Sequence, residues 1–106
     1  MKAIIEVKAL SQDWKPPFKK NVKTEEITVQ ENMEFDALRE KGHLFKVHRI
    51  SGDKILVEYN RAYTLKGYEQ PQNRAVWIGL NESKSFSALW DENGVTKTLT
   101  VKSINA

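Results

Sequence analysis

The sequence contains no cysteine, and none of its apolar runs approaches the roughly 20 residues that a membrane-spanning helix needs. Without cysteine the fold has neither disulfides nor thiol chemistry, so side-chain packing must hold it together. Lys2, Ala3 and Ile5 resemble the start of a secretory signal, but Glu6 and Lys8 interrupt the apolar segment that such a signal requires. We expect a cytoplasmic protein with no membrane segment; a secreted protein whose signal has been removed would have the same composition.

Side chains suited to catalysis are also scarce. The two histidines, His43 and His48, are five residues apart on one predicted strand, so they point to opposite faces and do not share a metal ion. Ser83, Ser85 and Ser87 lie on one strand face, but the sequence has no Gly-x-Ser-x-Gly elbow and no phosphate-binding glycine loop. This pattern predicts a protein that is not an enzyme and that uses no metal or cofactor.

The composition is otherwise ordinary for a globular domain, with 106 residues of which 40% are hydrophobic and 29% are charged. This length predicts one β domain over residues 1–106 with a single core. The net charge is +3, and residues 25–42 are acidic whereas residues 1–24 and 43–66 are basic. We expect the acidic segment to complement its basic neighbours on the surface, which argues against one large basic face.

Period-two alternation of apolar residues predicts strands along most of the chain. The central pattern runs from residue 43 to 65 and forms a hairpin. A three-residue loop at Ser51–Asp53 pairs Ile50 with Lys54, and the same register sets three further pairs. These are Val47 with Val57, Phe45 with Tyr59, and Lys46 with Glu58 as an ion pair. We therefore predict an aliphatic, an aromatic and an ionic pair in this hairpin.

Further strands are predicted at residues 2–9, 25–30 and 75–80, and a closing hairpin joins 84–90 to 95–104 around Asn93 and Gly94. A four-residue loop in that hairpin would pair Phe86 with Leu99, but the turn sequence also fits shorter loops and leaves the register open. Residues 75–80 are apolar on both faces, which predicts either a central strand of a sandwich or a tryptophan, Trp77, presented to a partner.

Residues 33–41 fit two structures. Asn32 and Gly42 are suited to cap the two ends of a short helix. Alternatively, Met33, Phe35 and Ala37 continue the period of two after a turn at Glu31–Asn32. Since the surrounding pattern is β throughout, we favour the strand. The whole chain predicts an all-β, mostly antiparallel sandwich or small barrel of about seven or eight short strands.

Residues 11–24 lose the alternation, and Pro16 and Pro17 exclude a helix interior or a central strand. We predict a long loop here, and it carries the most suggestive surface groups of the chain. Aromatic rings between ammonium groups are typical of single-stranded nucleic-acid binding, in which rings stack on bases and lysines follow phosphates. The candidate binding residues are Trp14, Lys15, Phe18, Lys19, Lys20 and Lys23, together with Tyr68 and Trp77 on other segments.

The function expected from these observations is a non-catalytic binding or assembly module that contacts another protein or associates with itself through a strand edge. Two alternatives remain open. The first is a nucleic-acid-binding domain that uses the aromatic and basic loop. The second is a carbohydrate-binding sandwich in which flat rings stack on sugars, with candidates Trp14, Tyr68, Trp77 and Trp90.

Overall fold

The computed structural model describes residues 1–13, 16, 20–35, 45–60, 63–65, 73–89 and 93–105, with the side chains of residues 89 and 93 left aside. Within these ranges the chain is all-β and forms nine strands in two antiparallel sheets. The strands are β1 (Lys2–Asp13), β2 (Lys20–Gln30), β3 (Glu34–Phe35), β4 (Phe45–Ile50), β5 (Lys54–Glu58), β6 (Thr64–Leu65), β7 (Ala75–Gly79), β8 (Ser83–Leu89) and β9 (Asn93–Asn105). The predicted all-β, mostly antiparallel fold is confirmed. Of the two predicted architectures the two sheets correspond to the sandwich, with nine described strands in place of the expected seven or eight.

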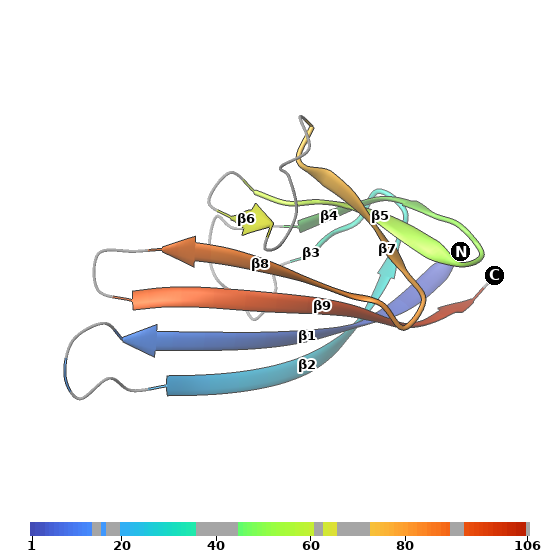
Figure 1. The fold of residues 1–106 in the computed structure, drawn as a ribbon. Coiled ribbons are helices and arrows are strands. Elements are labelled where there is room, and N and C mark those ends of the chain that lie inside the picture. The colour runs from blue at the N-terminus through green and yellow to red at the C-terminus, as the bar shows by residue number, and fades with distance from the viewer. Residues whose placement is uncertain are drawn as a thin grey trace.

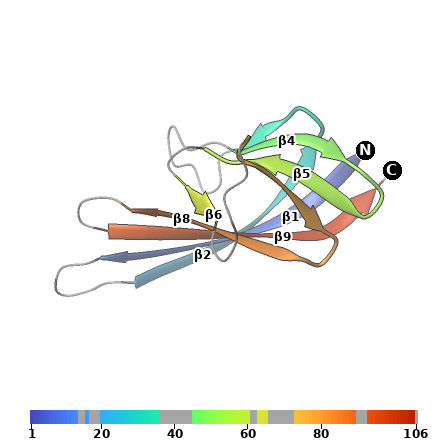
Figure 2. The same ribbon diagram turned by 45° about the horizontal axis from the view of Figure 1, so that its top comes forward.

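The two sheets differ in size and reach. The first sheet has five strands in the order β2-β1-β9-β8-β6, and the second has four in the order β3-β4-β5-β7. Figures 1 and 2 show the second sheet over the end of the first sheet at which the chain termini lie. Two hairpins of the first sheet, β1–β2 and β8–β9, extend past it in the same direction.

The core lies between the sheets and follows the predicted alternation. On β1 the side chains of Ala3, Ile5 and Val7 are fully buried, and Leu99 and Val101 of β9 lie beside them. The second sheet contributes a matching set from its own inner face: Phe45, Val47, Ile55, Val57 and Ile78. Burying one such side chain contributes roughly 1.5 to 3 kcal/mol, so these two rows supply most of the cohesion between the sheets.

An aromatic cluster joins the sheets where the first sheet begins to extend beyond the second. The ring centroid of Phe45 lies 5.5 Å from Phe35, 5.1 Å from Tyr63 and 5.3 Å from Phe86. Tyr59 packs on the same Phe86 at 5.1 Å. Such ring pairs contribute about 0.5 to 1.5 kcal/mol beyond the area they bury, so Phe86 is a main anchor of the β8–β9 hairpin.

The central hairpin is β4–β5, and its predicted register is half right. Lys46 lies opposite Glu58 and Val47 opposite Val57, as predicted. A bulge at His48 then shifts the pairing, so Ile50 lies opposite Ile55 and not opposite Lys54. The extra residue lets both isoleucines face the core, which the unbulged register would not allow.

The contacts of this hairpin also correct two predicted pairs. The ladder begins at Lys46 and Glu58, so Phe45 and Tyr59 are not paired in it. The Glu58 carboxylate contacts Nε2 of His48 at 3.4 Å, and this contact takes the place of the predicted ion pair with Lys46. The turn is tighter than predicted, because the Ser51 N–H donates a 2.9 Å hydrogen bond to the carbonyl of Lys54.

The prediction of a loop over residues 11–24 is wrong for most of its length. β1 continues to Asp13 and β2 begins at Lys20, with Gln12 opposite Lys20 in the ladder. The apolar alternation is missing here because nothing in the described structure covers residues 20–26, all of which are exposed. Alternation reports burial on one face, so a strand exposed on both faces gives no such signal.

The strand β7 occupies a different place from the one predicted. It lies at the edge of the second sheet, not at its centre, and pairs only with β5. Trp77 is 40% exposed on the face of this sheet that is turned away from the core. Of the two predictions for this strand, the central position is therefore wrong.

Two further segments settle questions that the sequence left open. In the closing hairpin Phe86 lies opposite Lys97 and Ala88 opposite Val95, so the pairing of Phe86 with Leu99 is wrong. Glu34–Phe35 form the short strand β3 after a turn in which Asn32 has a φ of 65°, and residues 36–41 lie outside the described ranges. The favoured strand is confirmed for those two residues.

Candidate functional site

The outer edge of β2 is the longest unpaired strand edge in the part of the chain that the structure describes. β2 has 11 residues, and β1 pairs with it on one side only. Between residues 20 and 29, no described residue hydrogen-bonds to the side of β2 that faces away from β1. Such an edge presents a row of N–H and C=O groups that another chain can pair with. Figure 1 shows β2 as the outermost strand of the first sheet.

The sequence of β2 forms this strand despite its exposure. Val22, Thr24, Ile27, Thr28 and Val29 are β-branched, which favours extended backbone. Val29 is buried and Ile27 packs against the core, so one end of the strand is anchored. The rest of β2 is held by its ladder to β1, and its side chains are exposed on both faces.

The pairing with β1 determines on which face of the sheet each charged side chain of β2 lies. Lys23 lies opposite Ala9 and Glu25 opposite the buried Val7, so both charged residues lie on the core-facing side of the sheet. Glu26 is on the outer face, directly opposite Glu6. Like charges in this position are destabilising.

The charge of Glu6 is offset by a third side chain on the neighbouring strand. Nζ of Lys102, on β9, lies 3.6 Å from the carboxylate of Glu6.

The structure places three of the predicted binding residues and does not bring them all together. Lys20 and Lys23 are both exposed on β2 but lie on opposite faces of it. Trp77 lies on β7, in the other sheet. The other candidates are outside the described ranges: Trp14, Lys15, Phe18, Lys19 and Tyr68.

The sequence also contains a pattern that indicates the paired charges of this edge. Lys23 and Glu25 are two residues apart, a spacing that puts opposite charges on one face of a strand. Apolar alternation does not indicate this strand segment, because residues 20–26 are exposed on both faces.

Trp77 forms a small surface site of its own. Its neighbour across the ladder is Leu56 of β5, and Nζ of Lys54 lies 4.7 Å from the ring centroid. A cation over a tryptophan face contributes about 0.5 to 1 kcal/mol at an exposed site. One face of the ring is therefore already covered by a side chain of the same protein, which disfavours sugar stacking on that face.

The serine row on β8 is a structural ladder. Ser83, Ser85 and Ser87 lie on one face, as predicted, and each is hydrogen-bonded through its hydroxyl to a threonine of β9. The oxygen distances are 2.6 Å to Thr100, 2.9 Å to Thr98 and 3.3 Å to Thr96. These cross-strand pairs stabilise the β8–β9 hairpin on its solvent side.

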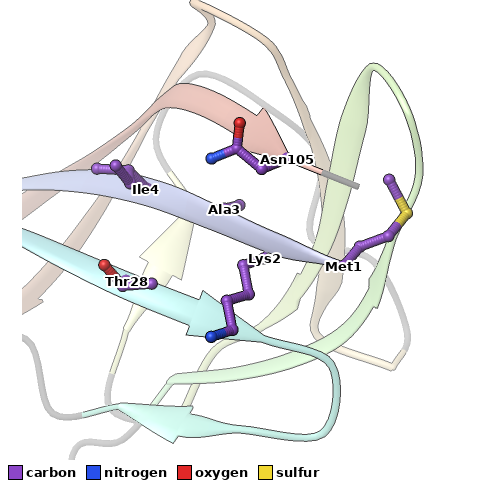
Figure 3. Close-up of a pocket in the computed structure, with 6 residues that line it drawn as sticks. All are labelled: Met1, Lys2, Ala3, Ile4, Thr28 and Asn105. Carbon is purple, nitrogen blue, oxygen red and sulfur yellow. The ribbon is translucent and has the colours of Figure 1, made fainter.

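Two surface hollows are lined by residues that the structure describes. One of about 570 Å³ lies beside the chain ends and is lined by Met1, Lys2, Ala3, Ile4, Thr28 and Asn105. Figure 3 shows the side chains of Lys2 and Asn105 pointing away from each other, so their polar groups do not converge on one ligand position.

The second hollow, of about 360 Å³, is lined by Glu58, Tyr59, Asn60, Asn73 and Arg74. Burial raises the pKa of the Tyr59 hydroxyl above its usual range, and the positive charge of Arg74 partly opposes this. The Arg74 guanidinium lies 5.9 Å from the Tyr59 ring centroid, and its Nη1 donates a 3.2 Å hydrogen bond to the carbonyl of Tyr63. These contacts tie the β6 region to the second sheet.

Within the described ranges, no three acidic or histidine side chains gather closely enough to hold a metal ion. The same ranges contain no helix that is long and apolar enough to span a membrane. Comparison with protein-family models, with curated proteins and with solved structures found no match to this chain.

Proposed function

We propose that this protein is a non-catalytic assembly module, and that it joins another polypeptide chain by adding a strand to β2. The observation that carries the proposal is the 11-residue strand that is hydrogen-bonded on one side only and exposed on both faces over residues 20–26. In strand addition the main-chain hydrogen bonds supply affinity, and the alternating side chains supply specificity.

The other edges are less suited to this role. β7 is five residues long and carries the Lys54 and Trp77 contact, while β3 and β6 have two residues each. A net contribution of roughly 0.5 to 1.5 kcal/mol for each hydrogen bond makes the number of paired residues decisive. β2 is about twice as long as β7, so a strand added to β2 forms the largest number of main-chain hydrogen bonds.

The charges on β2 select among partners. Lysines on an edge strand prevent indiscriminate pairing, and this edge carries Lys20 and Lys23 together with Glu25 and Glu26. A partner strand must set acidic groups against the lysines and basic groups against the glutamates. The same mixture disfavours a nucleic-acid backbone along β2, because the glutamates repel phosphates that the lysines attract.

A selection of random 12-residue peptides displayed on phage tests the proposal. The control is an edge-blocked variant, in which a proline blocks the outer edge of β2. Thr24→Pro and Glu25→Pro are both made, and their melting temperatures are compared. Successive N–H groups of a strand point alternately to its two sides, so one of these prolines removes an N–H that faces away from β1. That variant keeps a melting temperature near the wild type and serves as the control.

We expect the selected peptides to bind the wild type with alternating side-chain preferences and to lose that binding to the edge-blocked variant. Peptides that bind both proteins equally would show that another surface captures them. A selection that returns no binder would also contradict the proposal.

A further inference from the structure

We infer that the strand added to β2 comes from a second copy of this chain, paired antiparallel with Thr24 opposite Thr24. This inference rests on the proposed function of the β2 edge and identifies its partner. The result is a two-fold dimer in which two five-stranded sheets form one continuous sheet.

Symmetry restricts the possible registers. When two copies of one edge strand pair antiparallel, they are related by a two-fold axis perpendicular to the sheet. The core-facing side chains of both copies then lie on the same face of the joined sheet. Core-facing residues then pair with core-facing residues, and on β2 these are the odd-numbered positions, including Lys23 and Glu25. The axis must therefore pass midway between one residue and its own copy directly opposite.

Centring the pair on Thr24 brings opposite charges together. Lys23 lies opposite Glu25 of the second copy, and Glu25 lies opposite Lys23 of the second copy. The four charges alternate in sign on one face of the joined sheet, so each has an opposite charge both across the interface and two residues along its own strand. The overlap runs from Lys20 to Thr28, which uses most of β2.

Neighbouring registers set identical charges against each other. Centring on Lys23 places it opposite its own copy, and centring on Glu25 or on Glu26 does the same with a carboxylate. Like charges directly opposite each other are destabilising. A centre at Val22 or Ile27 avoids this conflict but shortens the overlap within β2. The Thr24 register combines the longer overlap with complementary charges.

The outer face supports the same register. There Glu26 lies opposite Val22 of the second copy and diagonal to Lys20 of that copy, a position that long side chains reach. Glu26 already lies opposite Glu6 within its own chain. The second copy therefore brings a cation to the one carboxylate on β2 that has a like charge beside it.

Sedimentation equilibrium of the full chain, with paired charge reversals, tests this arrangement. We expect the wild type to dimerise reversibly with concentration. Lys23→Glu or Glu25→Lys alone turns both symmetric attractions into repulsions and should weaken the dimer by roughly 30-fold. An equimolar mixture of the two single variants should dimerise as a heterodimer, because every facing pair is again of opposite sign. The double variant K23E/E25K should dimerise like the wild type.

The control is Lys8→Glu, which makes the same charge change on the exposed face of β1, one strand in from the edge and opposite Thr24 of its own chain. It should leave dimerisation within about two-fold of the wild type, because this lysine faces no residue of the second copy.

The results separate this inference from the proposed function. A wild type that is monomeric at all concentrations, while selected peptides still bind β2, overturns the inference and leaves strand addition in place. A dimer that is insensitive to both single variants, or a mixture that stays monomeric, also overturns it. A monomer whose β2 binds no peptide contradicts both.

Discussion

The two hairpins of the first sheet are built alike and supported differently. In β8–β9 the core-facing side chains are buried: Phe86, Ala88, Val95, Lys97 and Leu99. In β1–β2, residues 20–26 are exposed on both faces. One row across the sheet shows the gradient, from the fully buried Lys97 through the half-buried Ala9 to the exposed Lys23.

The difference follows from what each hairpin lies against. The aromatic residues Phe45, Tyr59 and Tyr63 pack around the β8–β9 hairpin, and β6 pairs with its outer strand. The described structure places no such cover on residues 20–26 and no strand beyond β2. One hairpin is covered and paired by other parts of the described chain, whereas the other leaves a strand edge and both faces of residues 20–26 open.

The largest expected effect comes from removing the anchor of the covered hairpin. Phe86→Ala should lower the free energy of unfolding by about 3 to 5 kcal/mol, because the ring is fully buried against the rings of Phe45 and Tyr59. Val22→Ala on the other hairpin, where the side chain is 56% exposed, should change it by at most about 0.5 kcal/mol. Urea unfolding measures both, and similar losses would remove the distinction between the hairpins.

The row of Lys97, Ala9 and Lys23 across the first sheet gives a second test. Lys97 is 0% exposed, with Nζ 5.6 Å from the Tyr63 ring centroid. Lys97→Ala should cost about 2 to 4 kcal/mol because it empties the space that the side chain fills, whereas Lys97→Met should cost less than about 1.5 kcal/mol.

The matched control for this row is Lys23→Ala, which should change the unfolding free energy by at most about 0.5 kcal/mol. If the alanine variant at Lys97 were as stable as this control, burial would not distinguish the two positions.

A smaller effect is expected at the turn that leads into the covered hairpin. Asn81 has a φ of 64°, and its N–H donates a 2.7 Å hydrogen bond to the carbonyl of Val101. Asn81→Ala should cost about 1 kcal/mol, because alanine disfavours this left-handed conformation. Asn81→Gly should be nearly neutral, since glycine adopts it readily. Thermal unfolding of the two variants checks the order, and a glycine variant less stable than the alanine variant would contradict it.

The smallest effect concerns Tyr59, whose ring packs on Phe86. Burial raises the pKa of its hydroxyl in the folded state, and Arg74 partly opposes the rise. The unfolded chain therefore loses this proton first, at about pH 10, and stability should fall as the pH rises beyond that value. Tyr59→Phe should flatten the fall. Urea unfolding between pH 8 and 11 measures it, and an identical slope in both proteins would argue against a buried hydroxyl.

The sequence predicted the covered parts of the fold better than the exposed parts. One face of each covered strand is buried, so apolar residues alternate along it and the sequence predicts the strand. Examples are Ile5 and Val7 on β1, Val47 on β4 and Val57 on β5. Residues 20–24 carry no alternation because neither face is buried, so the sequence predicts a loop there. The bulge at His48 and the pairing of Phe86 with Lys97 depend on how neighbouring strands align, which local patterns do not contain.

The candidate site was predicted only in part for the same reason. The chemistry of Lys20 and Lys23 indicates a binding role, but their place in the sequence groups them with the aromatic residues of a predicted loop. Their role on a strand edge depends on the pairing with β1, which places Glu25 beside Lys23 and leaves the other side of β2 open. Trp77 was predicted either inside a sandwich or on its surface, and only the sheet order places it at an edge.

Hydrogen exchange of the backbone amides of residues 20–29, followed by NMR as a function of protein concentration, tests the pairing of β2 most directly. At low concentration the alternate amides that face away from β1 should exchange rapidly, and those that face β1 should be protected. At concentrations that favour the dimer, we predict that the outward amides become protected around Thr24. Outward amides that exchange equally fast at every concentration would contradict self-pairing at this edge.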